Sequence, residues 1–207
     1  MIDFTVTQSG KKLNKKLYTW DENTKTFSSI ENNLVLDFSD VGNCTFNTGS
    51  GCTFKTGSEC TFNTGSECTF NTGSECTFNT GSGCTFKTGS ECIFKTGSNC
   101  IFKAYCSTFK TGDNCTFDTG HNCTFDTGSD CTFNTDYGCA FDTGVDCVVV
   151  RRDIFEVIEL EKYVKIKLNN CRIKGYTVIE DVKYIEIDGK KIEISLESYE
   201  KLKESLV

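Results

Sequence analysis

The chain has 207 residues and a formal charge of −7, from 29 acidic and 22 basic side chains. It contains 15 Cys, 18 Gly, 17 Phe and no Pro, while hydrophobic residues make up only 37%. This composition excludes a broad Leu-rich core, because so few apolar residues can bury only a narrow, aromatic one.

Charge and hydrophobicity also bear on location and partners. No run of about 18 apolar residues is present, so we expect no membrane span. The N-terminal residues lack the apolar stretch and cleavage site of a secretory signal, which predicts cytoplasmic synthesis with reduced thiols. Export by another route, for example inside a virus particle, is the alternative. The acidic balance, without a large basic cluster, predicts no nucleic-acid partner.

Residues 1–35 are expected to form an N-terminal β cap. Within it, the short segments 17–20 and 25–27 predict two strands joined by a polar turn, as in a hairpin. Residues 36–43 then have the pattern of a degenerate first repeat unit, with a Leu in place of the Cys that begins each later unit and with the Phe retained.

An eight-residue repeat of the form CTFNTGSE begins at Cys44 and continues for thirteen units to Asp146. Position three is Phe in every unit, and position five is Thr except at Ala104. Position six is Gly except at Tyr105 and Asp136, and the segment Gly-Ser-Glu is expected to supply the turn. Positions four, seven and eight vary; position four is Asn, Lys or Asp, and position eight is mostly Glu, Gly, Asn or Asp.

The alternation C-x-F-x-T predicts a half-buried strand with Cys, Phe and Thr facing inward. A helix is excluded because a period of eight would spread the Phe residues around its circumference. Disorder is hard to reconcile with a Phe every eight residues. The inward Phe residues are Phe46, Phe54, Phe62, Phe70, Phe78, Phe86, Phe94, Phe102, Phe109, Phe117, Phe125, Phe133 and Phe141. The inward Cys residues are Cys44, Cys52, Cys60, Cys68, Cys76, Cys84, Cys92, Cys100, Cys115, Cys123, Cys131, Cys139 and Cys147.

A five-residue strand with a three-residue turn cannot bury its own face, so the units must stack. We therefore expect an all-β fold, a parallel β-solenoid over residues 36–150. Two units per 16-residue coil would place two sheets face to face, with Phe opposite Phe. Three units per 24-residue coil is the alternative, but paired Phe rings favour the flattened form, because they fill a gap of about 10 Å.

Residues 151–207 are expected to form a small α+β capping or assembly module. Alternating segments after residue 154 predict further strands, and residues 184–194 predict a hairpin with Asp188-Gly189 in its turn. The segment 196–206 predicts a short amphipathic helix.

The CTFNTGSE and CTFKTGSE units, over roughly residues 36–150, resemble octapeptide-repeat parallel β-solenoid proteins associated with large phages and other viruses. The resemblance implies a rod on a virus particle or a factor that interacts with a host. It does not specify an activity.

The cysteines are expected to pack as small apolar groups and to remain mostly free thiols. Zinc and iron–sulfur sites use converging thiolates, usually from closely spaced Cys pairs, and the repeat contains none. Cys106 is the exception, because it ends the seven-residue unit 100–106, after which the frame resumes at Ser107. We expect Cys106 in a bulge, where it is the best candidate for an exposed thiol. His121, the only histidine, is expected to be an ordinary turn residue.

The segment 111–146 contains seven Asp and no Lys or Arg, so an acidic face is expected there. In a 16-residue coil Asp126 would lie beside Asp142, and Asp130 beside Asp146. Such stacked carboxylates repel each other unless they are solvated or bridged, which makes calcium binding a minor hypothesis. An acidic rod could also imitate DNA and inhibit a nucleic-acid enzyme.

Ice binding by the outward Thr columns is a further alternative, although the charged Lys and Asp beside them would disturb a regular lattice. No catalytic residue or cofactor is expected, because a stacked rod offers no concave site. The sequence therefore favours a non-enzymatic structural rod or binding element. A protein partner or self-association through residues 151–207 would complete that role.

Overall fold

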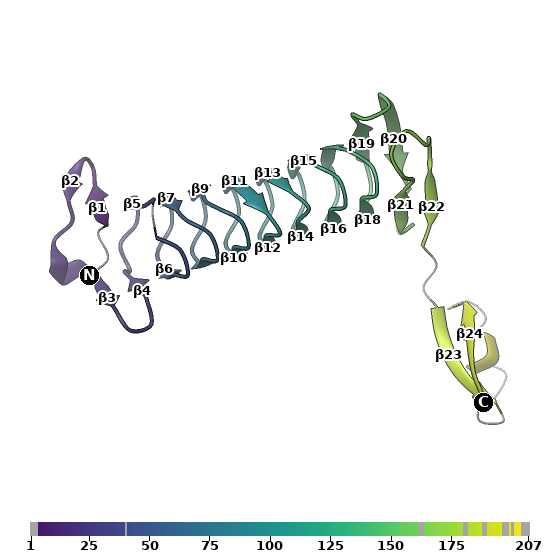
Figure 1. The fold of residues 1–207 in the computed structure, drawn as a ribbon, viewed down its shortest axis with the longest axis horizontal. Coiled ribbons are helices and arrows are strands. Elements are labelled where there is room, and N and C mark those ends of the chain that lie inside the picture. The colour runs from purple at the N-terminus through teal and green to yellow at the C-terminus, as the bar shows by residue number, and fades with distance from the viewer. Residues whose placement is uncertain are drawn as a thin grey trace.

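In the computed structural model, residues 4–39, 41–161, 164–179, 182–187, 190–195, 199 and 201–203 are described. Two long sheets, A and B, face each other along a rod (Figure 1). Sheet A contains, in spatial order, β2 (Lys11–Lys12), β1 (Thr5–Gln8), β5 (Leu34–Phe38), β7 (Thr53–Thr56), β9 (Thr69–Asn71), β11 (Thr85–Ser90), β13 (Ile101–Tyr105), β15 (Thr116–Thr119), β17 (Thr132–Thr135), β19 (Cys147–Arg151) and β20 (Glu156–Leu160).

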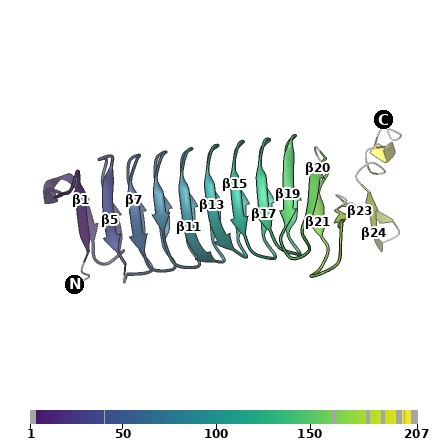
Figure 2. The same cartoon turned by 90° about the horizontal axis from the view of Figure 1, so that it is seen from above.

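Sheet B holds the alternate strands of the coils. In spatial order it contains β22 (Tyr176–Val178), β21 (Ile166–Leu168), β18 (Ala140–Asp142), β16 (Thr124–Asp126), β14 (Thr108–Lys110), β12 (Ile93–Lys95), β10 (Thr77–Asn79), β8 (Thr61–Asn63), β6 (Thr45–Asn47), β4 (Thr26–Ser28) and β3 (Thr19–Asp21). A 3₁₀ helix, η1 (Lys15–Leu17), precedes β3. The regular stacking of the strands is clearest from above (Figure 2).

Each coil of the rod is built from two repeat units, as predicted. Strands β8 and β10 are parallel neighbours, and Phe62 pairs with Phe78 sixteen residues later. The seven-residue unit shortens one coil to fifteen residues, so that Phe94 pairs with Phe109. Because the repeat strands are otherwise in register, equivalent positions of the repeat units lie one above the other.

The Phe and Cys columns form the core, as predicted. All thirteen Phe and all thirteen Cys of the columns are at most 2% exposed. Phe86 stacks on Phe70 of the same sheet, with ring centroids 4.9 Å apart, and meets Phe78 of the other sheet edge-on at 5.2 Å. Both geometries are favourable for aromatic rings, so the two sheets interlock along the entire rod.

The Gly-Ser-Glu segment joins successive strands, as predicted. The left-handed backbone falls at position eight, where Glu75 has a φ of +59°, rather than at the Gly of position six. Gly is needed at position six because adjacent coils approach closely there. A Cβ on Gly73 would lie 2.8 Å from the backbone nitrogen of Ser58, one coil earlier.

Replacing Gly73 with Ala should therefore destabilise the rod by about 1–3 kcal/mol, the usual cost of overpacking. Glu75→Gly is the matched change, since it relieves a left-handed non-glycine residue that costs about 1–2 kcal/mol. It should raise the denaturation midpoint, whereas Gly73→Ala should lower it. Equal and small effects of both substitutions, measured by urea unfolding, would contradict this assignment of the two positions.

The N-terminal hairpin is confirmed, because β3 and β4 pair antiparallel. β4 also pairs in parallel with β6, so it continues sheet B. The expected frame of the degenerate unit was wrong by two residues. Leu36, not Phe38, pairs with Phe54, and Phe38 pairs with Thr56. The shift preserves the alternation, so Leu34, Leu36 and Phe38 still face inward.

Antiparallel strands cover the C-terminal end of both sheets. β20 pairs with β19, and β21 with β18, while β22 follows β21. This pairing satisfies the outer edges of β18 and β19, and β20 and β22 become the terminal strands of the two sheets. Beyond the rod, β23 (Val182–Ile187) and β24 (Lys190–Ser195) pair only with each other, which confirms the predicted hairpin strands.

The turn predicted at 188–189 lies outside the described residues, as does most of the predicted helix at 196–206; positions 199 and 201–203 are helical. Among the described residues, no helix is long and apolar enough to cross a bilayer.

Candidate functional site

The outward faces carry two side-chain rows per sheet, one mainly of Thr and one of Asn, Lys or Asp. On sheet B the Asn row is hydrogen-bonded, since Asn63 Nδ2 donates to Asn47 Oδ1 at 2.9 Å. Near the middle of the rod the second row becomes basic on both sheets. Its lysines there are Lys87 and Lys103 on sheet A, and Lys95 and Lys110 on sheet B.

The acidic segment is partly neutralised by residues from outside it. On sheet B, Asp126 and Asp142 are paired in register, as predicted. Lys110 Nζ lies 2.8 Å from an Asp126 carboxylate oxygen, and Lys165 Nζ lies 3.5 Å from Asp142. The two carboxylates are therefore flanked by a lysine on each side.

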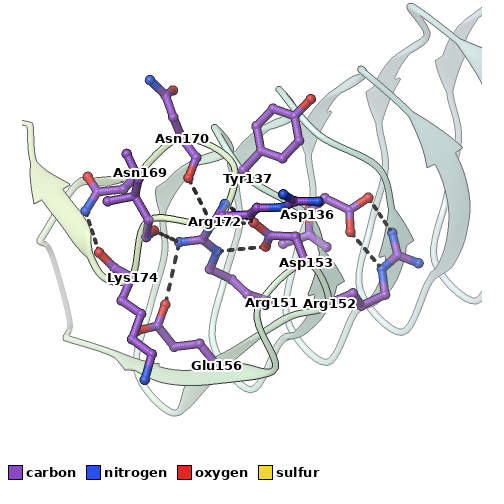
Figure 3. Close-up of polar contacts among 12 residues, drawn as sticks. Asp136, Tyr137, Arg151, Arg152, Asp153, Glu156, Asn169, Asn170, Arg172 and Lys174 are labelled. Carbon is purple, nitrogen blue, oxygen red and sulfur yellow. Dashed lines mark hydrogen bonds and ion pairs between the residues drawn. The ribbon is translucent and has the colours of Figure 1, made fainter.

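On sheet A, Arg152 performs the same role. Its guanidinium lies 2.7 Å from Asp118 and 3.3 Å from Asp136, as Figure 3 shows for Asp136. The carbonyl of Thr119 accepts a further hydrogen bond from this guanidinium. Arg152 thus joins two successive coils to the C-terminal cap.

The acidic face expected over residues 111–146 is therefore partly neutralised by neighbouring coils and by the cap. Four of the seven Asp residues in 111–146 have basic partners, supplied by the preceding coil and by the cap. Sequence reasoning missed them because they lie outside the segment and become neighbours only through stacking. Asp130 and Asp146 sit at the left-handed position of successive turns. No group of three or more potential metal-ligating side chains occurs in the described part of the chain.

All fifteen cysteines are free thiols in the structure, and the thirteen column cysteines are buried. Their Sγ atoms donate to nearby backbone carbonyls; that of Cys76 lies 3.5 Å from Ser74 O. Burial raises the pKa of Cys44 to about 11, so this thiol is protonated at neutral pH. Ser107 occupies the place of a column Cys, with its backbone nitrogen 3.4 Å from Cys123 Sγ.

A thiol-titrating disulfide reagent should accordingly modify two cysteines in the folded protein. Cys171 is exposed and should react first, followed by the half-buried Cys106. All fifteen should react in denaturant. Rapid modification of several column cysteines under native conditions would contradict the buried columns.

The single histidine has a partner that the sequence did not reveal. His121 Nδ1 lies 3.2 Å from Cys106 Sγ, and the Tyr137 ring packs against the imidazole with centroids 5.1 Å apart. Cys106 has a φ of +44°, just after the register shift in β13. Tyr105 pairs with Ser90, so it occupies position seven rather than the predicted position six.

An ionic cluster around a buried arginine holds the C-terminal cap (Figure 3). The fully buried Arg151 contacts Asp153 at 2.8 Å and Glu156 at 3.5 Å, and its Nη1 donates to the carbonyl of Ile173 at 2.8 Å. Burial would raise the pKa of Asp153, but hydrogen bonds from Arg151 and from the Arg172 backbone lower it overall. Each charged group of this cluster is hydrogen-bonded. We therefore interpret the cluster as structural: it holds the segment 169–175 against the end of β19.

A shallow groove of about 640 Å³ lies beside the N-terminal cap. Leu17, Tyr18 and Ile30 form its apolar part, and Asn47 and Asn63 its polar part. Ring stacking on Phe27 holds Tyr18 in place, with centroids 5.2 Å apart. The groove is a feature of the cap and was not anticipated from the sequence.

Comparison with protein-family models, with curated proteins and with solved structures gave no match for this chain.

Proposed function

We propose that this protein is a non-enzymatic rod that holds its C-terminal module at a distance and uses it for self-association or for binding a protein partner. The observation that carries the proposal is the contrast between the covered ends of sheets A and B and the strands that follow them. Antiparallel strands cover those ends, whereas the hairpin β23–β24 forms a separate sheet beyond them (Figure 1). The antiparallel end strands interrupt the parallel register in which a further coil would stack, so association would fall to the module.

The resemblance to octapeptide-repeat solenoids of phages and viruses supports a virion-associated or cell-associated setting for this role. The regular side-chain rows support a spacer, because each added coil lengthens the rod by about 4.8 Å without changing its cross-section. Residues 151–207 thus combine two tasks in this proposal. Their first strands cover the rod, and the remainder binds.

Light scattering on the full chain and on a chain ending at Ile179 tests the proposal. The truncation keeps β20, β21 and β22, so the rod ends stay covered. We expect a discrete oligomer for the full chain and a monomer for the truncated one. A monomer in both cases would contradict self-association. The two chains would then be immobilised and the proteins that bind to each compared; identical sets on the full and the truncated chain would contradict binding through the module.

The alternatives draw on the same faces and have weaker support. The hypothesis that the protein imitates DNA and inhibits a nucleic-acid enzyme has less support, because four of the seven Asp residues of the acidic segment have basic partners. Calcium binding at Asp126 and Asp142 competes with the flanking lysines. Ice binding requires a regular Thr face, which Ile93 and Ile101 interrupt at 52% and 54% exposure.

A further inference from the structure

The last strand of sheet B has an open edge. β22 is terminal in this sheet, and among the described residues it pairs only with β21. Ile179 N donates to Lys165 O at 2.7 Å. Hydrogen-bonded and non-hydrogen-bonded pairs alternate along an antiparallel ladder, so the N–H and C=O groups of Tyr176 and Val178 point away from β21. The edge of β22 can therefore accept a further strand.

Apolar side chains are exposed at the same edge. Tyr176 and Val178 pair in register with Leu168 and Ile166, which are buried in the core. Cross-strand partners lie on the same face of a sheet, so Tyr176 and Val178 belong to the core-facing side of sheet B. They are nevertheless 40% and 50% exposed, because the rod ends here. A strand added to β22 would bring cover for these two side chains.

The hairpin β23–β24 lacks a neighbouring strand as well. In the part of the chain that the structure describes, its two strands pair only with each other. A two-stranded hairpin on its own is marginally stable in water. Ile192 on β24 is exposed, so the hairpin also has apolar surface left to bury. Figure 1 shows the hairpin beyond the end of β22 rather than beside its edge.

Charge favours a contact between the hairpin and the end of sheet B. The segment 164–179, which contains β21 and β22, has four basic residues and no acidic ones. The segment 180–195, which contains the hairpin, has five acidic and three basic residues. By contrast, the segment 156–161 at the open edge of β20 has three Glu and no basic residue. Complementary charge therefore directs the hairpin to β22 rather than to β20.

We propose that two copies of this chain exchange their hairpins, so that β23 of each copy pairs with the open edge of β22 of the other. This inference rests on the proposed function, because it names the surface through which the C-terminal module self-associates. Three residues, 179–181, separate β22 from β23, a length that commonly joins neighbouring antiparallel strands. Exchange of an identical element between two copies gives a closed dimer rather than a fibre. Main-chain hydrogen bonds would supply the affinity, as in other cases of strand addition.

A proline at the open edge tests the proposal. Val178→Pro removes an N–H group that points away from β21, and proline is tolerated at such positions of edge strands. We expect light scattering to show a dimer for the full wild-type chain and a monomer for Val178→Pro. Circular dichroism and urea unfolding should show that the rod is intact in both.

Val157→Pro is the matched control, at the open edge of sheet A. Val148 N donates to Cys131 O, so Val149 directs its backbone groups toward β20, where it pairs with Ile158. The N–H of Val157 therefore points away from β19, as that of Val178 points away from β21. We expect Val157→Pro to remain a dimer, because the hairpin does not use the edge of β20.

Mixing two chains identifies what occupies the edge. A chain ending at Ile179 keeps β22 but has no hairpin, whereas full-length Val178→Pro keeps the hairpin but has a blocked edge. Each should be monomeric alone, and together they should form a one-to-one complex. A truncated chain that still dimerises, or the absence of the mixed complex, would overturn the exchange.

The outcomes also separate this proposal from the function on which it rests. A wild-type dimer that persists in Val178→Pro, or that is lost equally in Val157→Pro, would overturn pairing at β22 and leave self-association through the module intact. A monomeric wild-type chain would contradict both.

Discussion

Truncating one Phe in the middle of the rod should have the largest effect of any core change. Phe86 is 1% exposed and contacts four Phe rings, two stacked at 4.9 Å and two edge-on at 5.2 Å. Phe86→Ala should lower the free energy of unfolding by about 3–5 kcal/mol, because the cavity lies between in-register strands that cannot close over it. Urea unfolding followed by circular dichroism measures the change.

Thr85→Ala is the matched control for Phe86→Ala. Thr85 precedes Phe86 on β11 and faces outward. Its replacement should change stability by less than about 0.5 kcal/mol, as expected for a surface side chain. If both variants unfolded at the wild-type urea concentration, the inward assignment of the Phe column would be wrong.

Loss of the buried guanidinium at the C-terminal cap should have a comparable effect. Arg151→Met removes the buried charge that compensates Asp153 and Glu156, whose side chains are only 10% and 19% exposed, and so breaks both ion pairs. Breaking a buried ion pair in this way costs about 3–5 kcal/mol. We expect hydrogen exchange to accelerate first in β20, β21 and β22, which the cluster holds against the rod.

Arg152→Met provides the comparison, because Arg152 is the next residue and its side chain is 36% exposed. Its ion pairs with Asp118 and Asp136 are partly screened, so this variant should lose no more than about 1 kcal/mol. Equal exchange rates in the cap of both variants would contradict the role assigned to Arg151.

The same cluster predicts acid sensitivity of the cap. The pKa of Asp153 is lower in the folded protein than in the unfolded chain. Its contribution is therefore fully present above the unfolded pKa and is lost as the pH falls through the folded value. Cap stability should decline in acid below the ordinary carboxyl range, and Arg151→Met should weaken that dependence. Exchange measured across this pH range would show whether the decline disappears with the arginine.

Most of the architecture of the repeat could be predicted from the sequence, because every unit has the same pattern of inward and outward residues. An inward Phe every eight residues specifies the strand face, and the identical units specify stacking in register. The degenerate unit illustrates the limit of this reasoning. Alternation alone places Leu36 and Phe38 inward in either frame, so only the pairing of Leu36 with Phe54 reveals the register.

The candidate sites were less accessible to sequence reasoning, because they depend on which residues stacking brings together. Cys106 and His121 are fifteen residues apart, a separation that becomes a contact only in the shortened coil. Arg152 reaches Asp118 from 34 residues away. The signal available in the sequence was the spacing between side chains of complementary chemistry. A spacing of fifteen or sixteen residues indicates contact between adjacent coils, but only once the coil length is known.

The central claim is that two octapeptide units make one coil, and a distance between two spin labels tests it most directly. Lys55 and Asn134 face outward on sheet A and are related by five steps of in-register pairing. Labels on Lys55→Cys and Asn134→Cys, with Cys106 and Cys171 replaced by Ser, should report backbones about 24 Å apart, at about 4.8 Å per coil. A narrow distribution around that value is the predicted result. A separation of about 16 Å along the rod, which three units per coil would require, would contradict it.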